Sequence, residues 1–404
     1  MQAHGPLKGI KVVEIGVAMA GPFCAMLLGD YGADVIKIEK VEGGDDSRTW
    51  PPYFHGKLSY YYASTNRNKR CIALDLKQPE AVEIARELIR DADVLVQNYR
   101  PGALDRMGLD WESLSKLNPR LVYCAISGFG RKGDMALDPA NDLFMQAFSG
   151  GMSVTGFPGQ SPVKMGISVA DIGAGMFAAL GVMMALRERD RTERGQRVDT
   201  SLLEGQVAML AHFFTRYFAS GIVPGPMGGG ALNNPTYQSY QAADGWIVIA
   251  AFNDRMWRGL AQAVGAPEWL EVPEYATQDK REVKREEIIR LLAERIAKKN
   301  QAHWLEVLSQ AGVPCSPVHR LDQVAAHPQV HAAEMIQTLM ADQLGEIRMA
   351  GLPIKLEQAP GSVRMPPPRL GQHTEEILKQ AGRTQADIDA LSASRAVKLD
   401  TGWN

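Results

Sequence analysis

The stretch VKMGISVADIGAGMFAALGVMMAL, from Val163 to Leu186, joins a short strand-like run, one carboxylate and a long apolar segment. The run ends in Asp171, and no further charge appears before Arg187. Small and apolar residues in such a run predict a buried core helix over Asp171–Leu186. A lone carboxylate at the start of a buried helix is either an N-terminal cap or a chemical reagent, because both positions favour Asp.

Length and composition predict a soluble protein of two domains. The chain has 404 residues, with 45% hydrophobic and 22% charged residues, which is typical of globular proteins larger than one core. A formal charge of −2 gives no reason to expect nucleic acid or an anionic membrane as a partner. The longest apolar run, Ile172–Leu186, is shorter than the roughly 20 residues of a membrane span.

The terminus and the cysteines favour a cytoplasmic location. The N-terminal sequence MQAHGPLKG has no apolar signal core. Four cysteines (Cys24, Cys71, Cys124 and Cys315) lie far apart without CxxC or Cys/His ligand spacing. We therefore expect buried thiols in a reducing compartment.

Strand-like runs alternate with helical stretches through the first part of the chain. Helices are predicted from Pro22 to Tyr31 and from Pro79 to Arg90. This alternation indicates βαβ units, and hence an α/β fold with a parallel sheet. The predicted strands are Ile10–Ile15, Val35–Glu39, Ile72–Leu76, Val94–Gln97 and Leu121–Ile126.

Residues that suit a phosphate-bearing ligand lie around these predicted strands. Ligands of parallel sheets bind beyond the carboxyl ends of the strands. Glycines, amides and cations there suit phosphates and an aromatic base, although any single Lys or Arg is more often a solvated surface charge. The residues are the turn Gly16–Gly21, Glu39, Lys40, Asn66–Arg70, Lys77, Asn98, Tyr99, Arg100 and Ser127–Gly130.

Later segments predict more helices and a second, smaller domain. A glycine- and proline-rich stretch at Gly221–Pro235 indicates a hinge or an active-site loop. We expect a large domain over residues 1–225, a small α+β domain over 226–330, and a return to the large domain over 331–404. Further predicted elements are helices at Asp138–Ser149, Ser201–Ser220 (aromatic, core or interface), Asp254–Val264, Glu282–Lys298, His303–Ala311 and Thr374–Gln380, a solvated helix end and turn at Arg187–Arg197, and a strand at Gly245–Ala251.

Common catalytic patterns are missing from the sequence. His327 and His331 lie four apart without an accompanying acid, so no metal site is expected. No GxSxG elbow and no cysteine in a basic, glycine-rich turn supports a Ser or Cys nucleophile. Glu39 follows the turn GVAMAG by about 20 residues, as a ribose-binding acid would, but the turn lacks GxGxxG, which leaves a nicotinamide-dependent oxidoreductase as a minor alternative.

Asp171 remains as a candidate nucleophile. The more frequent role of such a residue is a helix cap. The helix dipole would keep its carboxylate ionised, as a nucleophile requires. The small residues Gly173–Gly175 would let a bulky ligand approach.

The order of motifs resembles the family III CoA-transferases, which include formyl-CoA transferase, carnitine CoA-transferase and the alpha-methylacyl-CoA racemases. Besides the run around Asp171, the matching segments are LKGIKVVEIGVAMAGPFCAMLLGDYGADVIKIEK, NRNKRCIALDLK, ADVLVQNYRPGALDRMGL, NPRLVYCAISGFG, RGQRVDTSLLEG, ADGWIVIA, GVPCSPV and LGQHTEEIL. The resemblance implies a Rossmann-like large domain with an inserted small domain, and two chains interlocked as a homodimer or as a heteromer of paralogues.

The resemblance also implies roles for individual residues. Asp171 is the implied nucleophile, which forms a mixed anhydride and then an aspartyl-CoA thioester. Gly228, Gly229 and Gly230 match a mobile glycine loop that covers the intermediate. CoA and acyl-CoA are substrates, and no bound cofactor or metal is implied. The implied CoA-binding positions are Ala18, Lys40, Leu74, Lys77, Asn98, Tyr99, Arg106 and Met107.

Three residues depart from the family pattern. Met19 stands where transferases often have Gln or Arg, and Asn234 stands in place of a histidine before proline. Asn141 replaces the acid/base histidine of the racemases. An amide does not take a proton from an alpha carbon, so a racemase or isomerase is the weaker alternative. We expect all three residues to line the acyl pocket.

Overall fold

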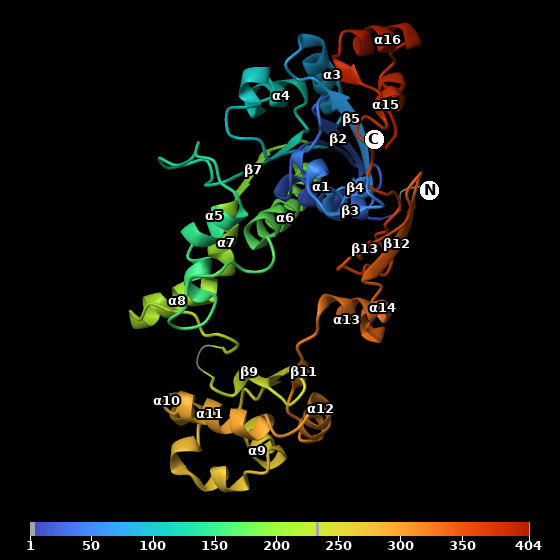
Figure 1. Ribbon diagram of the computed structural model, residues 1–404. Helices are drawn as coiled ribbons and strands as arrows, with labels where there is room; N and C mark the ends of the chain where they lie inside the picture. The colour runs from blue at the N-terminus through green and yellow to red at the C-terminus, as the bar shows by residue number, and fades with distance from the viewer. Residues whose placement is uncertain (1–4, 232–233, 404) are drawn as a thin grey trace. The chain divides into compact units, whose positions relative to one another are not determined.

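The computed structural model describes residues 5–231 and 234–403, which form two compact units. The first unit contains the described residues up to Gly151, Lys164–Ala219 and the chain from Pro328 onward. The second contains Met152–Val163 and Ser220–His327. Figure 1 follows the chain through both units by colour. The first unit is thus assembled from three separate segments.

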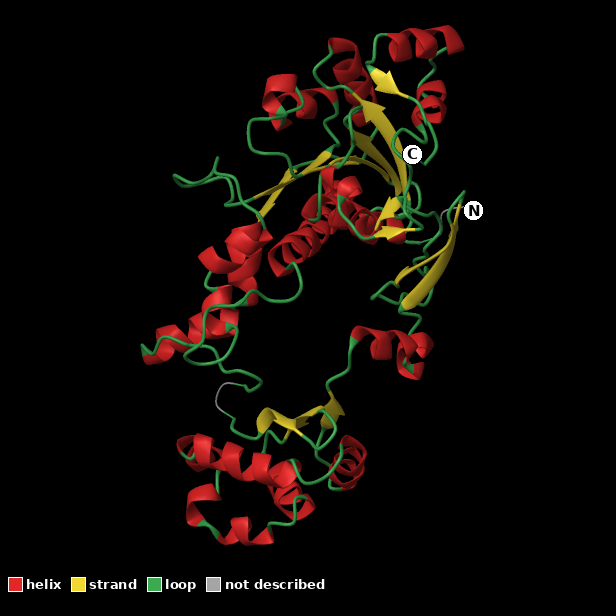
Figure 2. Cartoon of the chain, viewed as in Figure 1, coloured by secondary structure: helices red, strands yellow, loops and turns green. Residues whose placement is uncertain are grey.

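A seven-stranded sheet, drawn in yellow in Figure 2, forms the centre of the first unit. Neighbouring strands are parallel except for β14 against β5. In chain order the six parallel strands run 3-2-1-4-5-6, the doubly wound Rossmann order, so the predicted parallel α/β sheet is confirmed. The sheet order is β14 (Val397–Lys398), β5 (Lys69–Leu74), β2 (Asp34–Glu39), β1 (Lys11–Ile15), β6 (Val94–Gln97), β7 (Val122–Ser127) and β8 (Arg197–Ser201).

Both faces of the sheet are buried, which explains the continuous apolar runs of its strands. Successive side chains point to opposite faces, so Val12 packs in one core and Val13 in the other. The Val12 core lies under α1 (Ala20–Asp30) and α6 (Val169–Thr192). The other core lies under α3 (Pro79–Arg90), α4 (Trp111–Leu117), α15 (Thr374–Gln380) and α16 (Gln385–Ala393).

Helix α6 begins at Val169, and the residues before it do not form the expected strand. It ends at Thr192, within the charged run Arg187–Arg197 for which a solvated helix end and turn were predicted. Its sheet-facing side is buried in the core, as predicted, but Met176, Leu180 and Met184 on the other side are more than half exposed. Length and hydropathy would let this one described helix cross a membrane, yet over half of that stretch is buried, as in a core helix.

Two other helices differ from their predicted bounds. The single helix expected over Ser201–Ser220 is two helices, α7 (Leu202–Met209) and α8 (Ala211–Ser220). Of the two roles expected for its aromatic residues, core or interface, the core role is wrong for α8, which has no buried residue. Helix α5 spans Asp142–Phe148 rather than beginning at Asp138, because the Asn141 side chain accepts a hydrogen bond from the Phe144 N–H and caps it. Cys24, Cys71 and Cys124 are buried, as predicted, whereas Cys315 is only partly buried.

The second unit is a small α+β assembly with its own core. Three antiparallel strands, β9 (Tyr237–Gln241), β10 (Trp246–Ala250) and β11 (Cys315–Pro317), pack with a helical layer. Trp257 and Trp269 stack in this core with ring centroids 6.0 Å apart. The helices are α9 (Asp254–Ala263), α10 (Gln278–Val283), α11 (Arg285–Ile296), α12 (Gln301–Gln310) and α13 (Leu321–Ala326).

The first unit also contains two short hairpins and further helices. They are β3 (Tyr53–Phe54) with β4 (Leu58–Ser59), β12 (Ile336–Ala341) with β13 (Gly345–Ala350), α2 (Tyr60–Thr65) and α14 (Pro328–Ala332). The first hairpin and α2 pack with the second hairpin in a small separate core.

Gly175 sets the approach of α6 to α1. A Cβ atom there would lie 2.7 Å from the Ala20 carbonyl oxygen, a backbone atom that moves only with its helix. Gly175→Ala should therefore lower the free energy of unfolding by about 1–2 kcal/mol, since this overlap outweighs the roughly 1 kcal/mol that Ala gains over Gly in a helix. Gly166→Ala, with no atom within 4 Å of the added Cβ, is the control. Equal urea midpoints for the two variants would contradict this packing.

Candidate functional site

Asp171 is the third residue of α6 and lines a cavity of about 130 Å³. The N-cap is Ser168, which makes no side-chain capping bond, so the interpretation of Asp171 as a cap is wrong. The cavity lies at the carboxyl ends of β6 and β7 and at the start of α1, beside the β1–β6 boundary where the strand order reverses and doubly wound sheets bind ligands. Other lining residues are Ala20, Asn98, Tyr99, Arg100, Ser127, Asp138 and Leu202.

Burial and the nearby Asp142 carboxylate raise the pKa of Asp171 to about 7. The expectation that the helix dipole keeps Asp171 ionised is therefore wrong, because desolvation and like-charge repulsion outweigh it. Asp142 is itself fixed, accepting hydrogen bonds from the Ala170 N–H at 2.9 Å and the Gln146 amide at 2.7 Å. The two carboxylates are thus held beside the first turn of α6.

Tyr61 is a neighbour of Asp171 that the sequence reasoning missed. Burial and the Asp171 charge raise the pKa of the Tyr61 phenol to about 12, and the side chain hydrogen-bonds with Ser168. Its ring meets Trp50 edge to face with centroids 4.6 Å apart. The aromatic run Tyr60–Tyr62 was the available signal, but its spacing does not reveal a contact with α6.

The turn after β1 is held by side chains from three other segments. Lys37 Nζ donates to the Gly16 carbonyl at 2.8 Å, and Asp45 accepts from the Ala18 N–H at 3.1 Å. The Asn98 amide both accepts from the Val17 N–H at 2.9 Å and donates to the Val17 carbonyl at 3.0 Å. With these two N–H groups already engaged, the turn does not offer them to a pyrophosphate, as a dinucleotide-binding turn does.

Cations without a buried acidic partner follow the carboxyl ends of β2, β5 and β6. Lys77, Arg100 and Arg106 are exposed and form no ion pair within the described chain, and Lys40 pairs with Asp46 at 2.6 Å where both are more than half exposed. Of the other predicted CoA positions, Tyr99 lines the cavity. The side chain of Leu74 is buried, so only its main chain, at the end of β5, could face a ligand. Met107 is partly buried against the sheet core.

Other predicted ligand residues have structural partners. Arg67 pairs with Asp30 and Lys69 with Glu14, both at 2.7 Å, and Arg70 pairs with Asp34 at 2.6 Å. These residues lie at the start of β5, not at its carboxyl end, so their predicted place at the ligand edge is wrong. Glu39 receives two hydrogen bonds from Arg48 at 2.8 Å, which leaves it no role as a ribose-binding acid.

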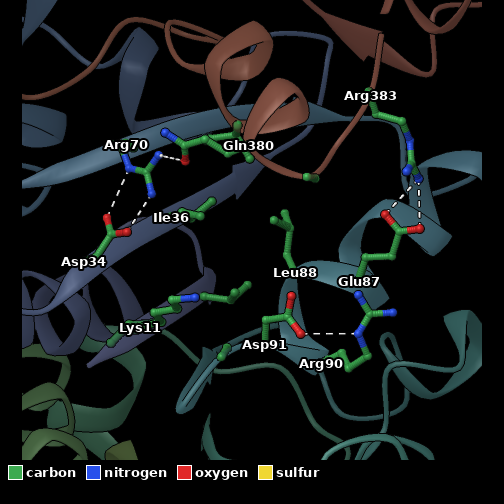
Figure 3. Close-up of a pocket in the computed structure, with 15 residues that line it drawn as sticks. Lys11, Asp34, Ile36, Arg70, Glu87, Leu88, Arg90, Asp91, Gln380 and Arg383 are labelled. Atoms are coloured by element: carbon green, nitrogen blue, oxygen red, sulfur yellow. Dashed lines mark hydrogen bonds and ion pairs between the residues drawn. The ribbon is translucent and has the colours of Figure 1, made fainter. Parts of the chain in front are cut away.

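A larger cavity, of about 480 Å³, lies at the opposite, amino-terminal edge of the sheet. Figure 3 shows that each of its arginines turns toward an acid. Arg70 pairs with Asp34 at 2.6 Å, Arg90 with Asp91 at 3.3 Å and Arg383 with Glu87 at 2.8 Å. Because each of these arginines is already paired with a carboxylate, the larger volume of this cavity does not make it the anion site.

The remaining predicted residues lie in several places. Met19 is buried at the start of α1, and Asn141 is the cap of α5. In the second unit, Asn234 accepts from the Thr236 N–H and donates to the carbonyl of Ala251, which follows β10. The place of Met19, Asn141 and Asn234 in an acyl pocket stays a prediction. The N–H groups of Gly228 and Gly230 donate hydrogen bonds to carbonyls of the same unit, whereas the Gly229 N–H donates no backbone hydrogen bond among the described residues. The described residues contain no cluster of metal-binding side chains.

Comparisons with known proteins agree over nearly the whole chain. The sequence model of CoA-transferase family III matches residues 7–374. The human succinyl-CoA:glutarate CoA-transferase is 36% identical over 94% of this chain and 86% of its own length. The succinate–glutarate CoA-transferase of Agrobacterium fabrum is 37% identical over 93% and 95% of the two chains. A crystal structure of a CaiB/BaiF family protein from Brucella suis, 35% identical, superposes with a TM-score of 0.84 over 93% of this chain and 99% of that one.

The raised pKa of Asp171 predicts a stability change that needs no substrate. The value of about 7 exceeds the ordinary 3.8, so the folded chain holds this proton more tightly and loses stability as pH rises between these values. Asp171→Asn should raise the free energy of unfolding at pH 8 by about 1–3 kcal/mol, with a smaller gain at pH 5. Urea unfolding at both pH values tests this, with Asp190→Asn, at an exposed acid outside the cavity, as control. A gain independent of pH would contradict the shifted pKa.

Proposed function

This chain belongs to CoA-transferase family III, and we propose that it moves CoA between two carboxylic acids through a covalent intermediate on Asp171. The observation that carries the proposal is the Asp171 carboxylate, which lines a cavity at the switch point of the sheet. A carboxylate with a pKa near 7 is partly ionised at neutral pH and more nucleophilic than an ordinary Asp.

The CoA moiety is proposed to lie along the carboxyl edge of the sheet. Lys40, Lys77 and Arg106 bind its phosphates there, because exposed cations without a buried acid partner attract phosphate. Tyr99 packs against the ligand, and the main chain at Ala18 and Leu74 is close to the adenosine. Each of these assignments follows from family membership, and the strand-end positions support it.

The proposed reaction exchanges acyl bonds without proton transfer. A carboxylate oxygen of Asp171 attacks the donor thioester carbon, CoA leaves as a thiolate, and a mixed anhydride forms. The thiolate then attacks the aspartyl carbonyl, which releases the donor acid and leaves an aspartyl-CoA thioester. The acceptor carboxylate attacks that thioester and expels the thiolate. The thiolate finally attacks the acceptor carbonyl of the new anhydride, which forms the product and frees Asp171.

The acids are proposed to be short dicarboxylates, with succinyl-CoA as the donor and glutarate as the acceptor. The names of the human and Agrobacterium fabrum relatives support this choice. No observation favours racemase activity, because Asn141 is an amide that caps α5. An oxidoreductase is disfavoured because the turn N–H groups bond to Asn98 and Asp45.

Trapping the intermediate tests the role of Asp171. With succinyl-CoA, borohydride should reduce the acylated Asp171 to homoserine, which peptide mass spectrometry locates. Asp171→Asn should lose transfer to glutarate by at least about 10³-fold, because an amide forms neither acyl intermediate. Asp190→Asn, an exposed acid on the same helix, should keep full activity. Full transfer by Asp171→Asn would refute the proposal.

We also propose that the chain forms a homodimer through the exposed apolar face of α6 and α8. Met184 on α6 is 62% exposed and Phe218 on α8 is 76% exposed, which is unusual for large apolar side chains. On α6, Phe177, Leu180 and Met184 line an apolar cavity of about 360 Å³. A second copy would bury this surface. A heteromer with a paralogous chain is the alternative partner.

Light scattering of the purified chain tests the dimer. We expect the mass of two copies for the wild type and of one copy for the double variant Leu180→Glu/Met184→Glu, because two buried carboxylates oppose association. Leu321→Glu, at a leucine on α13 that is 87% exposed, should remain dimeric. A wild-type chain with the mass of one copy would contradict the proposed interface.

A further inference from the structure

We propose that Asp45 is a positioning residue that fixes the turn Val17–Met19 and so shapes the CoA site. The inference rests on the proposed function, because it assigns a role to a residue that supports the CoA-binding segments without touching CoA. Asp45 is 1% exposed and follows β2, in the segment that also contains Lys40. It was not among the residues singled out in the sequence.

The Asp45 carboxylate is saturated with donors from different segments. Its Oδ1 accepts from the Ala18 N–H at 3.1 Å and from the Ser47 N–H at 3.0 Å. Its Oδ2 lies 3.1 Å from Lys37 Nζ. Ala18 has a φ of 62°, a left-handed conformation that a non-glycine residue adopts at a cost, and the bond from its N–H stabilises that conformation.

A buried network of ion pairs holds the Asp45 carboxylate in place. Lys37 Nζ pairs with Glu14 Oε1 at 2.7 Å, and Glu14 Oε2 pairs with Lys69 Nζ at 2.7 Å, with all three side chains fully buried. Glu14 and Lys37 are direct neighbours in the parallel register of β1 and β2, so the sheet itself sets their contact. Lys69 then donates to the Pro22 carbonyl of α1 at 2.9 Å.

The lysines of this network donate hydrogen bonds to carbonyls at both ends of the turn. Lys37 holds Gly16 before the turn, and Lys69 holds Pro22 after it. Glycine at position 16 makes this possible, because a Cβ there would lie 3.0 Å from Glu14 Oε1. Buried ion pairs contribute little net stability compared with apolar packing, so a network of this size is better explained by the geometry that it imposes.

Asp45 also connects two segments that the proposed CoA site requires. Its side chain holds Ala18, and its own N–H donates to Glu39 Oε2 at 2.7 Å, which anchors the segment after Lys40 to β2. The positions of Ala18 and Lys40 therefore depend on the same residue. Loss of the Asp45 carboxylate frees the turn without removing any group that contacts CoA.

The test measures CoA binding by calorimetry and amide hydrogen exchange in the peptide that contains Val17–Met19. Asp45→Ala should raise the dissociation constant for CoA at least tenfold and speed exchange in that peptide. Asp45→Asn keeps an acceptor for the Ala18 N–H and should stay within threefold of the wild type. Asp93→Ala is the matched control, because Asp93 also accepts a backbone N–H, from Lys11, and pairs with buried Arg189 at the far edge of the sheet.

The outcomes separate this inference from the proposed function. A folded Asp45→Ala that binds CoA within threefold of the wild type, or an equal loss in Asp93→Ala, overturns the positioning role. If Asp45→Ala does not fold, Asp45→Ser carries the same expectation. A wild type that does not bind CoA refutes the proposed function instead, and faster exchange at the turn in Asp45→Ala alone still supports the positioning role.

Discussion

The carboxylate of Glu14, buried between Lys37 and Lys69, is the interaction on which the site depends. It lies near the end of β1, the central strand, and its two partners come from β2 and β5 on one side. Removal of one member would leave an uncompensated charge in the core, so the three side chains must keep their places together. The turn after β1, which leads into α1 and the cavity residue Ala20, therefore has a rigid base.

Burial accounts for the chemistry of Asp171 as well as for its position. The residue lies in the first turn of α6, whose inner side packs on the sheet and on α1. The same packing removes water from the carboxylate, and Asp142 adds a second negative charge beside it. The outer side of α6 is apolar and exposed. One helix thus combines a perturbed carboxylate with a surface suited to association.

The sequence predicted five of the seven strands of the sheet, because apolar strand runs and prolines at helix starts act locally, but it missed the edge strands β8 and β14 and placed β5 too late. The bounds of α3, β6 and α15 agree with the predicted ones to the residue. Contacts between distant segments were beyond it: nothing local distinguishes Lys69, paired with Glu14, from Lys77, which has no acidic partner within the described residues. For the same reason, the sequence did not show that Asp142 and Tyr61 lie near Asp171. The predicted direction of the pKa shift of Asp171 was therefore wrong.

A pKa near 7 suits both halves of the proposed exchange. The attacking carboxylate must be basic enough to add to a thioester, and a raised pKa increases that nucleophilicity. The same carboxylate must later leave from an anhydride, which a still more basic group would do poorly. Burial with one neighbouring acid gives Asp171 an intermediate value, whereas an ordinary exposed aspartate would be a weaker nucleophile. The site thus meets two opposed demands by desolvating the carboxylate, without a metal or a proton donor in the proposed steps.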